Sequence, residues 1–168
     1  MPDIAGERLL LHPIDSEVAR ALLEGRTPDG LVLADDYPSP FSLEVMDLIA
    51  GSRAGEVQQF ESFFIVRRSD AAVIGEIGSS SDAPGSAQVG YSLVPSCWGR
   101  GYATEALRAL LGDLATRADV RRVVAETMVG HEASRRVMEK AGMVQCGRRR
   151  GEEAGESVEL VVYELVRG

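Results

Sequence analysis

The stretch from residue 88 to residue 117 constrains this chain most, because a strand pattern, a glycine loop and a helix pattern follow one another directly. Val89, Tyr91 and Leu93 alternate with small or polar residues, which is the period of a strand with one buried face. Gly99 and Gly101 then permit a tight turn. The apolar residues after the turn have the spacing of one buried helical face: Ala103, Ala106, Leu107, Leu110, Leu111 and Leu114.

A strand, a glycine loop and a helix N-terminus in this order present free backbone N–H groups and the positive end of a helix dipole, which suit phosphate oxygens. A Walker A loop is excluded, because no Lys follows either glycine. A dinucleotide-binding loop fits incompletely, because Thr104 stands at the third glycine position counted from Gly99. The sequence therefore predicts an anion-binding loop of another kind.

Residues 89–95 and 98–106, which read VGYSLVP and WGRGYATEA, resemble the central motif of the GNAT superfamily of N-acetyltransferases, and within it the branch of the ribosomal-protein-alanine N-acetyltransferases. Residues 131–143, which read HEASRRVMEKAGM, resemble the second motif, in which an Asn, a Ser and a Gly-Phe pair are spaced in this way. The resemblance covers residues 88–143, a third of the chain.

The resemblance implies the GNAT fold in a single domain over residues 1–168. This is an α/β (α+β) fold with a mixed central sheet of about seven strands and about four flanking helices. Two central strands, which end at Val94 and Val129, would splay apart and admit the pantetheine arm of acetyl-CoA. The implied cofactor-binding residues, with Leu93 and Val94 acting through backbone N–H groups, are Leu93, Val94, Trp98, Gly99, Arg100, Gly101, Tyr102, Ala103, Thr104, His131 and Ser134.

The second motif supplies a candidate general acid. Ser134 would protonate the cofactor sulfur, or else serve only as a residue of the first helical turn. Many members of the superfamily use a Tyr on this helix, but Met138 stands at the corresponding place. His131 replaces the usual Asn; it could hydrogen-bond to the pantetheine region or have a structural role only.

Three carboxylates are candidates for the base that removes the proton of the attacking ammonium: Glu76, Glu126 and Glu159. Each of them, taken singly, also fits an edge or surface charge. Gln88, where relatives often have an acid, cannot act as a base. The demand on a base is small for an N-terminal α-amine, because its pKa is about 7.7.

Composition favours a cytoplasmic protein with an amine-bearing partner. The net charge of −8 argues against a broad nucleic-acid surface and favours cationic small molecules or basic protein termini. The two cysteines, Cys97 and Cys146, have neither metal-ligand spacing nor a disulfide framework. The first residues lack a long apolar segment, so no membrane association is expected. Asp35 and Asp36, in a proline-rich connection, could hold an ammonium or remain solvated surface acids.

Outside the motifs, the patterns predict a helix over residues 43–50 capped by Ser42 and a flexible turn over residues 79–86. Strands are expected at residues 7–12, 60–67, 72–78, 122–129, 143–149 and 157–166, and helices at 16–24 and 132–141.

The sequence leaves the acceptor amine open among a protein N-terminus, a polyamine, an amino acid and an aminoglycoside. The alternatives are a non-catalytic acyl-CoA sensor and a nucleotide-dependent oxidoreductase. The oligomeric state is not readable from the sequence, but members of the superfamily are often dimers, so the resemblance is compatible with a homodimer.

Overall fold

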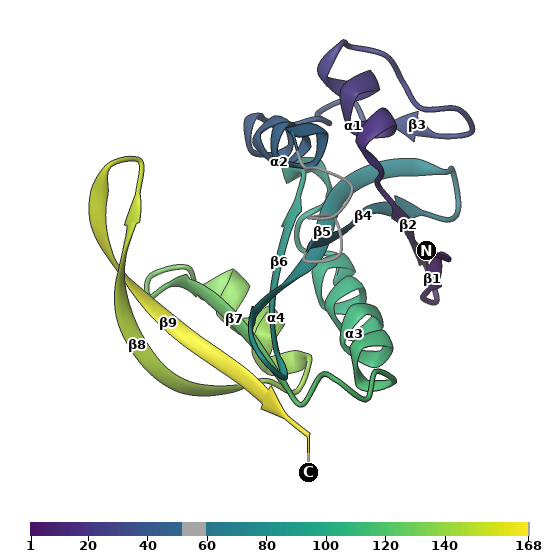
Figure 1. Cartoon of the computed structure of the whole chain (residues 1–168). Coiled ribbons are helices and arrows are strands. Elements are labelled where there is room, and N and C mark those ends of the chain that lie inside the picture. The colour runs from purple at the N-terminus through teal and green to yellow at the C-terminus, as the bar shows by residue number, and fades with distance from the viewer. Residues whose placement is uncertain (52–59, 168) are drawn as a thin grey trace.

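One mixed sheet runs through the computed structural model, which describes residues 1–51 and 60–167 (Figure 1). Its nine strands have the order β1-β2-β4-β5-β6-β7-β9-β8, and β3 pairs with β5 outside this path. The strands are β1 (Ile4–Ala5), β2 (Leu9–Pro13), β3 (Val32–Leu33), β4 (Phe60–Arg67), β5 (Ala72–Ala83), β6 (Ser86–Leu93), β7 (Arg122–Met128), β8 (Val144–Glu153) and β9 (Glu156–Val166). The helices are α1 (Ser16–Leu23), α2 (Pro40–Gly51), α3 (Tyr102–Ala115) and α4 (Glu132–Lys140).

The predicted mixed α/β architecture is confirmed, with four helices in the described part of the chain and more strands than expected. Two extra strands, β1 and β3, contain only two residues each, which is too short for an alternating pattern to be recognised. The predicted flexible turn over residues 79–86 is wrong, because β5 continues to Ala83 and pairs there with β6. The turn is shorter and centres on Gly85, whose φ of +77° suits glycine.

The predicted cap of α2 is also wrong. The hydroxyl of Ser39 accepts a hydrogen bond from the backbone N–H of Ser42 at 3.0 Å, so Ser39 caps a helix that begins at Pro40. Ser42 lies inside the first turn and is buried, with only 1% of its surface exposed. Its hydroxyl is therefore available to donate a hydrogen bond to another residue.

The helices cover both faces of the sheet. Along β5 and β6, Glu76 and Ser92 are paired and so share one face, whereas Tyr91 belongs to the other. Glu76 contacts Ser42 of α2, and Tyr91 contacts Ser134 of α4, so α2 and α4 lie on opposite faces. The predicted apolar face of α3 is buried from Ala106 to Leu114 and packs on the sheet.

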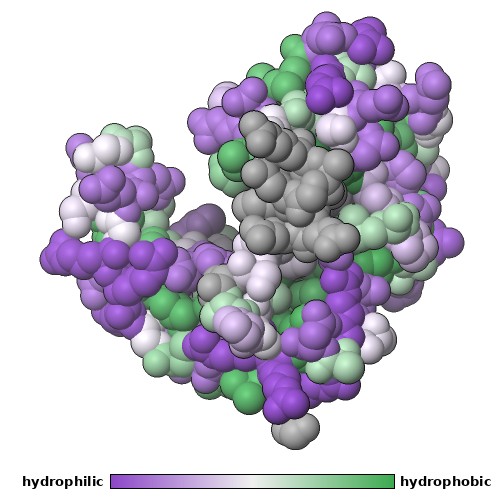
Figure 2. Space-filling view, viewed as in Figure 1, coloured by the Kyte–Doolittle hydropathy of each residue, from purple (hydrophilic) through white to green (hydrophobic). Residues whose placement is uncertain are grey.

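The central strands β6 and β7 are parallel and separate halfway along. Their pairing extends from Ser86 opposite Arg122 only to Val89 opposite Ala125. Beyond that point β6 stays paired with β5 as far as Leu93, and β7 stays paired with β9 as far as Met128. The expected splay of two central strands is thus present (Figure 1). The β8–β9 hairpin stands away from the body, and the surface is hollowed between the two (Figure 2).

Gly75 of β5 is required where β6 approaches the end of its pairing. A Cβ at this position would overlap the carbonyl oxygen of Ser92 and lie 3.1 Å from the Cα of Leu93, both in the backbone of β6. We predict that Gly75→Ala lowers the free energy of unfolding by about 2 kcal/mol, as overpacking does. Gly90→Ala, which has open space around the added Cβ, is the matched control. Urea unfolding of both variants checks this, and equal midpoints would contradict it.

Candidate active site

The separated strands expose backbone hydrogen-bonding groups to the gap between them. Val94 donates its N–H to the carbonyl of Ile74 at 2.9 Å. Because the direction of these bonds alternates along an antiparallel pair, Tyr91 and Leu93 turn their N–H groups away from β5 and toward the gap. Both Leu93 and Val94 were predicted to act through their backbones, but the N–H of Val94 is already bonded. Leu93 is therefore the donor available at the end of the strand.

The loop after β6 is held in a tight conformation that leaves its N–H groups free. Pro95–Cys97 form a 3₁₀ turn, and the indole N–H of Trp98 donates to the carbonyl of Leu93 at 2.9 Å. Gly99 and Gly101 have φ values of +74° and +80°, which explains the requirement for glycine at both. Within the described residues, no turn or loop bond uses the N–H groups of residues 99–104. These groups surround the N-terminus of α3, an arrangement that suits an anion.

Asp36 fixes the other end of this loop. Its carboxylate accepts hydrogen bonds from the backbone N–H of Ser96 at 2.9 Å and from the Ser96 hydroxyl at 2.7 Å. The backbone bond, and then the hydroxyl bond, lower the pKa of Asp36. Asp36 is therefore not free to hold an ammonium, one of the two roles expected for Asp35 and Asp36, because its oxygens are engaged within the protein.

A cavity of about 500 Å³ lies where α2 crosses β5 and β6. Glu76, one of the predicted bases, lines it and is only 3% exposed. Its two oxygens accept hydrogen bonds from the hydroxyls of Tyr37, at 3.0 Å, and Ser42, at 3.1 Å. Burial raises the pKa of Glu76, and the two hydroxyls only partly oppose this effect. The remaining lining residues include Phe41, Val45, Leu48, Gly78, Gln88, Gly90 and Tyr91.

Tyr91 connects β6 with the second motif, and neither sequence motif indicates it as a site residue. Its hydroxyl lies 3.0 Å from the Ser134 hydroxyl and donates to the Ser134 carbonyl at 3.2 Å. Burial raises the pKa of Tyr91. Met138, at the place of the usual tyrosine, is buried in the core. A phenol hydroxyl is thus present beside Ser134, although it comes from a strand and not from the helix.

His131 of the second motif is hydrogen-bonded within the protein. The Nδ1 atom of His131 lies 3.2 Å from the Thr127 hydroxyl, and the backbone N–H of His131 donates to the carbonyl of Met128.

Both oxygens of Glu126, the second predicted base, accept hydrogen bonds from the guanidinium of Arg149 on β8. Glu126 and Glu76 lie on the same face, whereas Ser134 lies on the other. Glu159, half exposed, pairs with Arg148.

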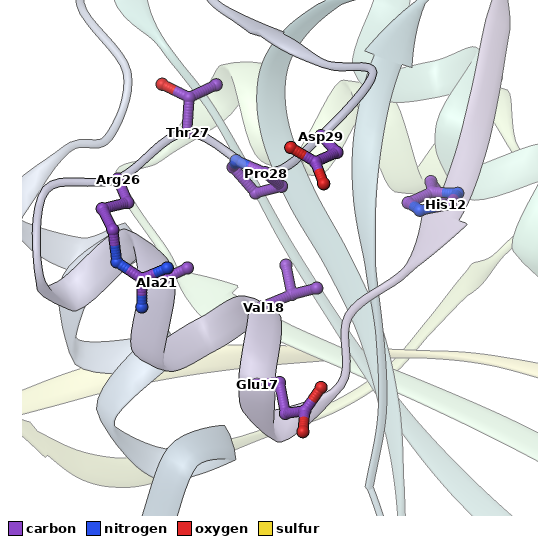
Figure 3. Close-up of a pocket in the computed structure, with 8 residues that line it drawn as sticks. All are labelled: His12, Glu17, Val18, Ala21, Arg26, Thr27, Pro28 and Asp29. Atoms are coloured by element: carbon purple, nitrogen blue, oxygen red, sulfur yellow. The ribbon is translucent and has the colours of Figure 1, made fainter.

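A second cavity, of about 300 Å³, lies between α1, the connection that follows it and β2 (Figure 3). Its lining contains none of the predicted site residues: His12, Glu17, Val18, Ala21, Arg26, Thr27, Pro28 and Asp29. His12 is paired with Asp3 at 2.8 Å. This cavity is separate from the gap between β6 and β7 and from the loop before α3.

A family model described as an acetyltransferase (GNAT) domain matches residues 8–144, which include the open strand edge, the glycine loop and the second motif. The chain belongs to the GNAT acetyltransferases. The protein is therefore an N-acetyltransferase, and the family assignment based on the two motifs is confirmed. No curated protein sequence matches the chain.

Solved structures share the whole fold. A RimL ribosomal L7/L12 alpha-N-protein acetyltransferase in complex with coenzyme A has a TM-score of 0.75 at 20% identity, over 99% of this chain and 98% of its own. A Salmonella typhimurium acetyltransferase that modifies the N-terminal serine of ribosomal protein L7/L12 has a TM-score of 0.75 at 18% identity, over 99% and 100%. A Bacillus anthracis GNAT acetyltransferase has a TM-score of 0.70 at 20% identity, over 98% of both chains.

Across residues 1–51 and 60–167, no helix combines the length and the apolar character needed to span a membrane. The same residues contain no group of three or more His, Cys, Asp or Glu side chains placed to hold a metal ion.

Burial of Glu76 predicts a specific dependence of stability on pH. Because its pKa is raised in the folded state, the folded chain keeps this proton at pH values where the unfolded chain has lost it. The free energy of unfolding should therefore fall as the pH rises from the ordinary pKa of a glutamate through the raised one. Glu76→Gln should remove this fall. Urea unfolding at a series of pH values measures it, and an identical pH dependence in both proteins would disprove it.

Proposed function

We propose that this chain transfers the acetyl group of acetyl-CoA to the N-terminal α-amine of a peptide or protein. The observation that carries this proposal is the continuity of the open edge of β6 with the loop before α3. Backbone N–H groups without a protein partner stand at Tyr91 and Leu93 and again at residues 99–104, so a long ligand with an amide arm and a pyrophosphate would meet donors at both of its polar parts.

The residues present fit acetyl-CoA. The N–H groups of residues 99–104 would hold the pyrophosphate, with the exposed Arg100 adding positive charge. The gap between β6 and β7 would hold the pantetheine arm, and the Leu93 N–H would polarise the carbonyl of the acetyl group, as an oxyanion-hole donor does. Bound acetyl-CoA would supply the acetyl group as a thioester and leave as the thiol.

The cavity beside Glu76 suits the acceptor. Phe41, Val45 and Leu48 lie on one face of α2 and line the cavity; Phe41 is 52% exposed and Leu48 is 72% exposed. A buried carboxylate below an apolar wall favours an ammonium attached to a chain with apolar groups, and peptide N-termini meet this description. Ribosomal proteins are the substrates named for the RimL and Salmonella relatives, which supports a protein amine.

Three groups of this chain would move the protons. Glu76 would accept a proton from the attacking ammonium, directly or through one water, since its raised pKa makes it a better base than an exposed glutamate. The Ser134 hydroxyl would donate a proton to the departing sulfur and recover one from the Tyr91 hydroxyl, 3.0 Å away. The ammonium would lose two protons in all, the first to Glu76 and the second, after the C–N bond has formed, to water. Water would return one proton to Tyr91 as the C–S bond breaks, so the products are an amide, a thiol and one net proton.

Glu126 is the weaker candidate for the base. The guanidinium of Arg149 occupies both of its oxygens, so neither oxygen is available to a substrate ammonium. Glu159 is half exposed and paired with Arg148. Of the three predicted carboxylates, only Glu76 combines burial, neutral hydrogen-bond donors and a place in a cavity.

The proposal predicts that acetyl-CoA and a suitable peptide together release free thiol. The measurement is thiol release with a panel of peptides that have apolar or charged residues after a free α-amine, the same peptides blocked at that amine, polyamines and aminoglycosides. Only free peptides should react, with those carrying apolar residues reacting best. Gly101→Glu should abolish coenzyme A binding, because it places a carboxylate at the anion loop. Release with polyamines or aminoglycosides alone would refute the peptide acceptor.

The assignment of the base predicts unequal effects for two similar substitutions. Glu76→Gln should lower turnover by about 100-fold or more and should remove the rise of the rate with pH, while coenzyme A affinity is retained. Glu126→Gln is the matched control and should change turnover only slightly. A larger loss in Glu126→Gln than in Glu76→Gln would reverse the assignment.

A further inference from the structure

Arg8 is an exposed arginine in the turn between β1 and β2, and its contacts gather on the loop before α3. Its Nη1 donates to the carbonyl of Arg100 at 2.9 Å, and its guanidinium lies 4.4 Å above the centre of the Tyr102 ring. A second guanidinium nitrogen, Nη2, lies close to Gly101. Arg8 thus contacts three consecutive residues of the loop, although it is more than ninety positions away in the sequence.

The bond to Arg100 determines the direction of a neighbouring donor. The carbonyl of Arg100 and the N–H of Gly101 belong to one peptide unit, and in a trans peptide they point in opposite directions. When Arg8 holds the carbonyl, the N–H of Gly101 is turned away from Arg8, toward the outer side of the loop. Gly101 caps α3 with a φ of +80°, and glycine alone would leave this peptide free to rotate.

Arg8 also neutralises Glu105, the acidic residue in the first turn of α3. The Glu105 carboxylate accepts a bond from the Arg8 Nε at 2.8 Å and one from the Arg8 backbone N–H at 2.9 Å. An unpaired carboxylate here would repel a pyrophosphate and compete with it for the positive end of the helix. The backbone of Arg8 is itself fixed, because its carbonyl accepts a bond from the Arg68 N–H at 2.9 Å.

We propose that Arg8 is a positioning residue of the cofactor site: it orients the Gly101 N–H toward the pyrophosphate and removes the charge of Glu105 from the anion loop. The inference rests on the proposed use of acetyl-CoA. It adds a residue from the first strands of the chain to a site that the sequence motifs place between residues 88 and 143.

The test is the affinity for coenzyme A, measured by calorimetry, since it requires no acceptor. Arg8→Ala should raise the dissociation constant about tenfold or more. Glu105→Gln in the same chain should restore part of the lost affinity, because it removes the carboxylate that Arg8 no longer neutralises. Glu105→Gln alone should bind at least as tightly as the original chain. Arg8→Lys, which keeps the charge but not the planar fork, should be intermediate.

Arg122→Ala is the matched control. The Arg122 side chain is 43% exposed, against 45% for Arg8, and it is paired with Glu164 at the opposite end of β6 and β7 from the loop. This variant should bind coenzyme A like the original chain. Thermal unfolding of each variant without ligand identifies any general loss of structure.

The outcomes separate the two proposals. If Arg8→Ala binds coenzyme A as tightly as the original chain, Arg8 has no positioning role. If the double variant binds coenzyme A as weakly as Arg8→Ala, the unpaired charge of Glu105 is not what weakens binding. The ion pair is then only a structural link between Arg8 and the helix. If the original chain does not bind coenzyme A at all, the proposed function itself fails.

Discussion

The site depends on the separation of two strands that begin as hydrogen-bonded neighbours. After Val89 and Ala125, β6 and β7 keep their outer partners, β5 and β9, and lose each other. Backbone donors of β6 are left without a strand partner inside the sheet, where unpaired polar groups are costly unless a ligand or water bonds to them. In the proposed reaction, the same opening would let helices on opposite faces contribute, because Glu76 belongs to the α2 side and Ser134 to the α4 side.

The local part of this arrangement could be predicted from the sequence. Glycines with positive φ, a buried helical stripe and two spaced motifs identified the loop, α3 and the family. The separation itself was available only through the family resemblance. Val89, Tyr91 and Leu93 follow one unbroken alternation, and nothing in it indicates that pairing with β7 ends after the first of them. Strand pairing is set by residues distant in sequence, which a local period does not contain.

Side-chain partners were the least predictable feature, for the same reason. Ser42 has the position of a helix cap in the sequence, but Ser39 takes that role and leaves Ser42 beside Glu76. Glu76 and Glu126 both stand on central strands, and only the fold gives one of them hydroxyl donors and the other an arginine. Tyr91 fits the alternation as a core residue, and its hydroxyl partner lies 43 positions away. A sequence can indicate candidate residues, but their hydrogen-bond partners and burial in the fold determine their chemical properties.

The two sides of α2 have one further consequence. Its exposed side carries Phe41 and Leu48, while its buried side carries Ser42, which donates to Glu76. Any ligand that pushes this helix outward also stretches that donor's bond, and a carboxylate that loses a donor becomes more basic. The apolar wall of the cavity and one hydrogen-bond donor of Glu76 therefore belong to the same helix, so the position of that wall and the basicity of the carboxylate are linked.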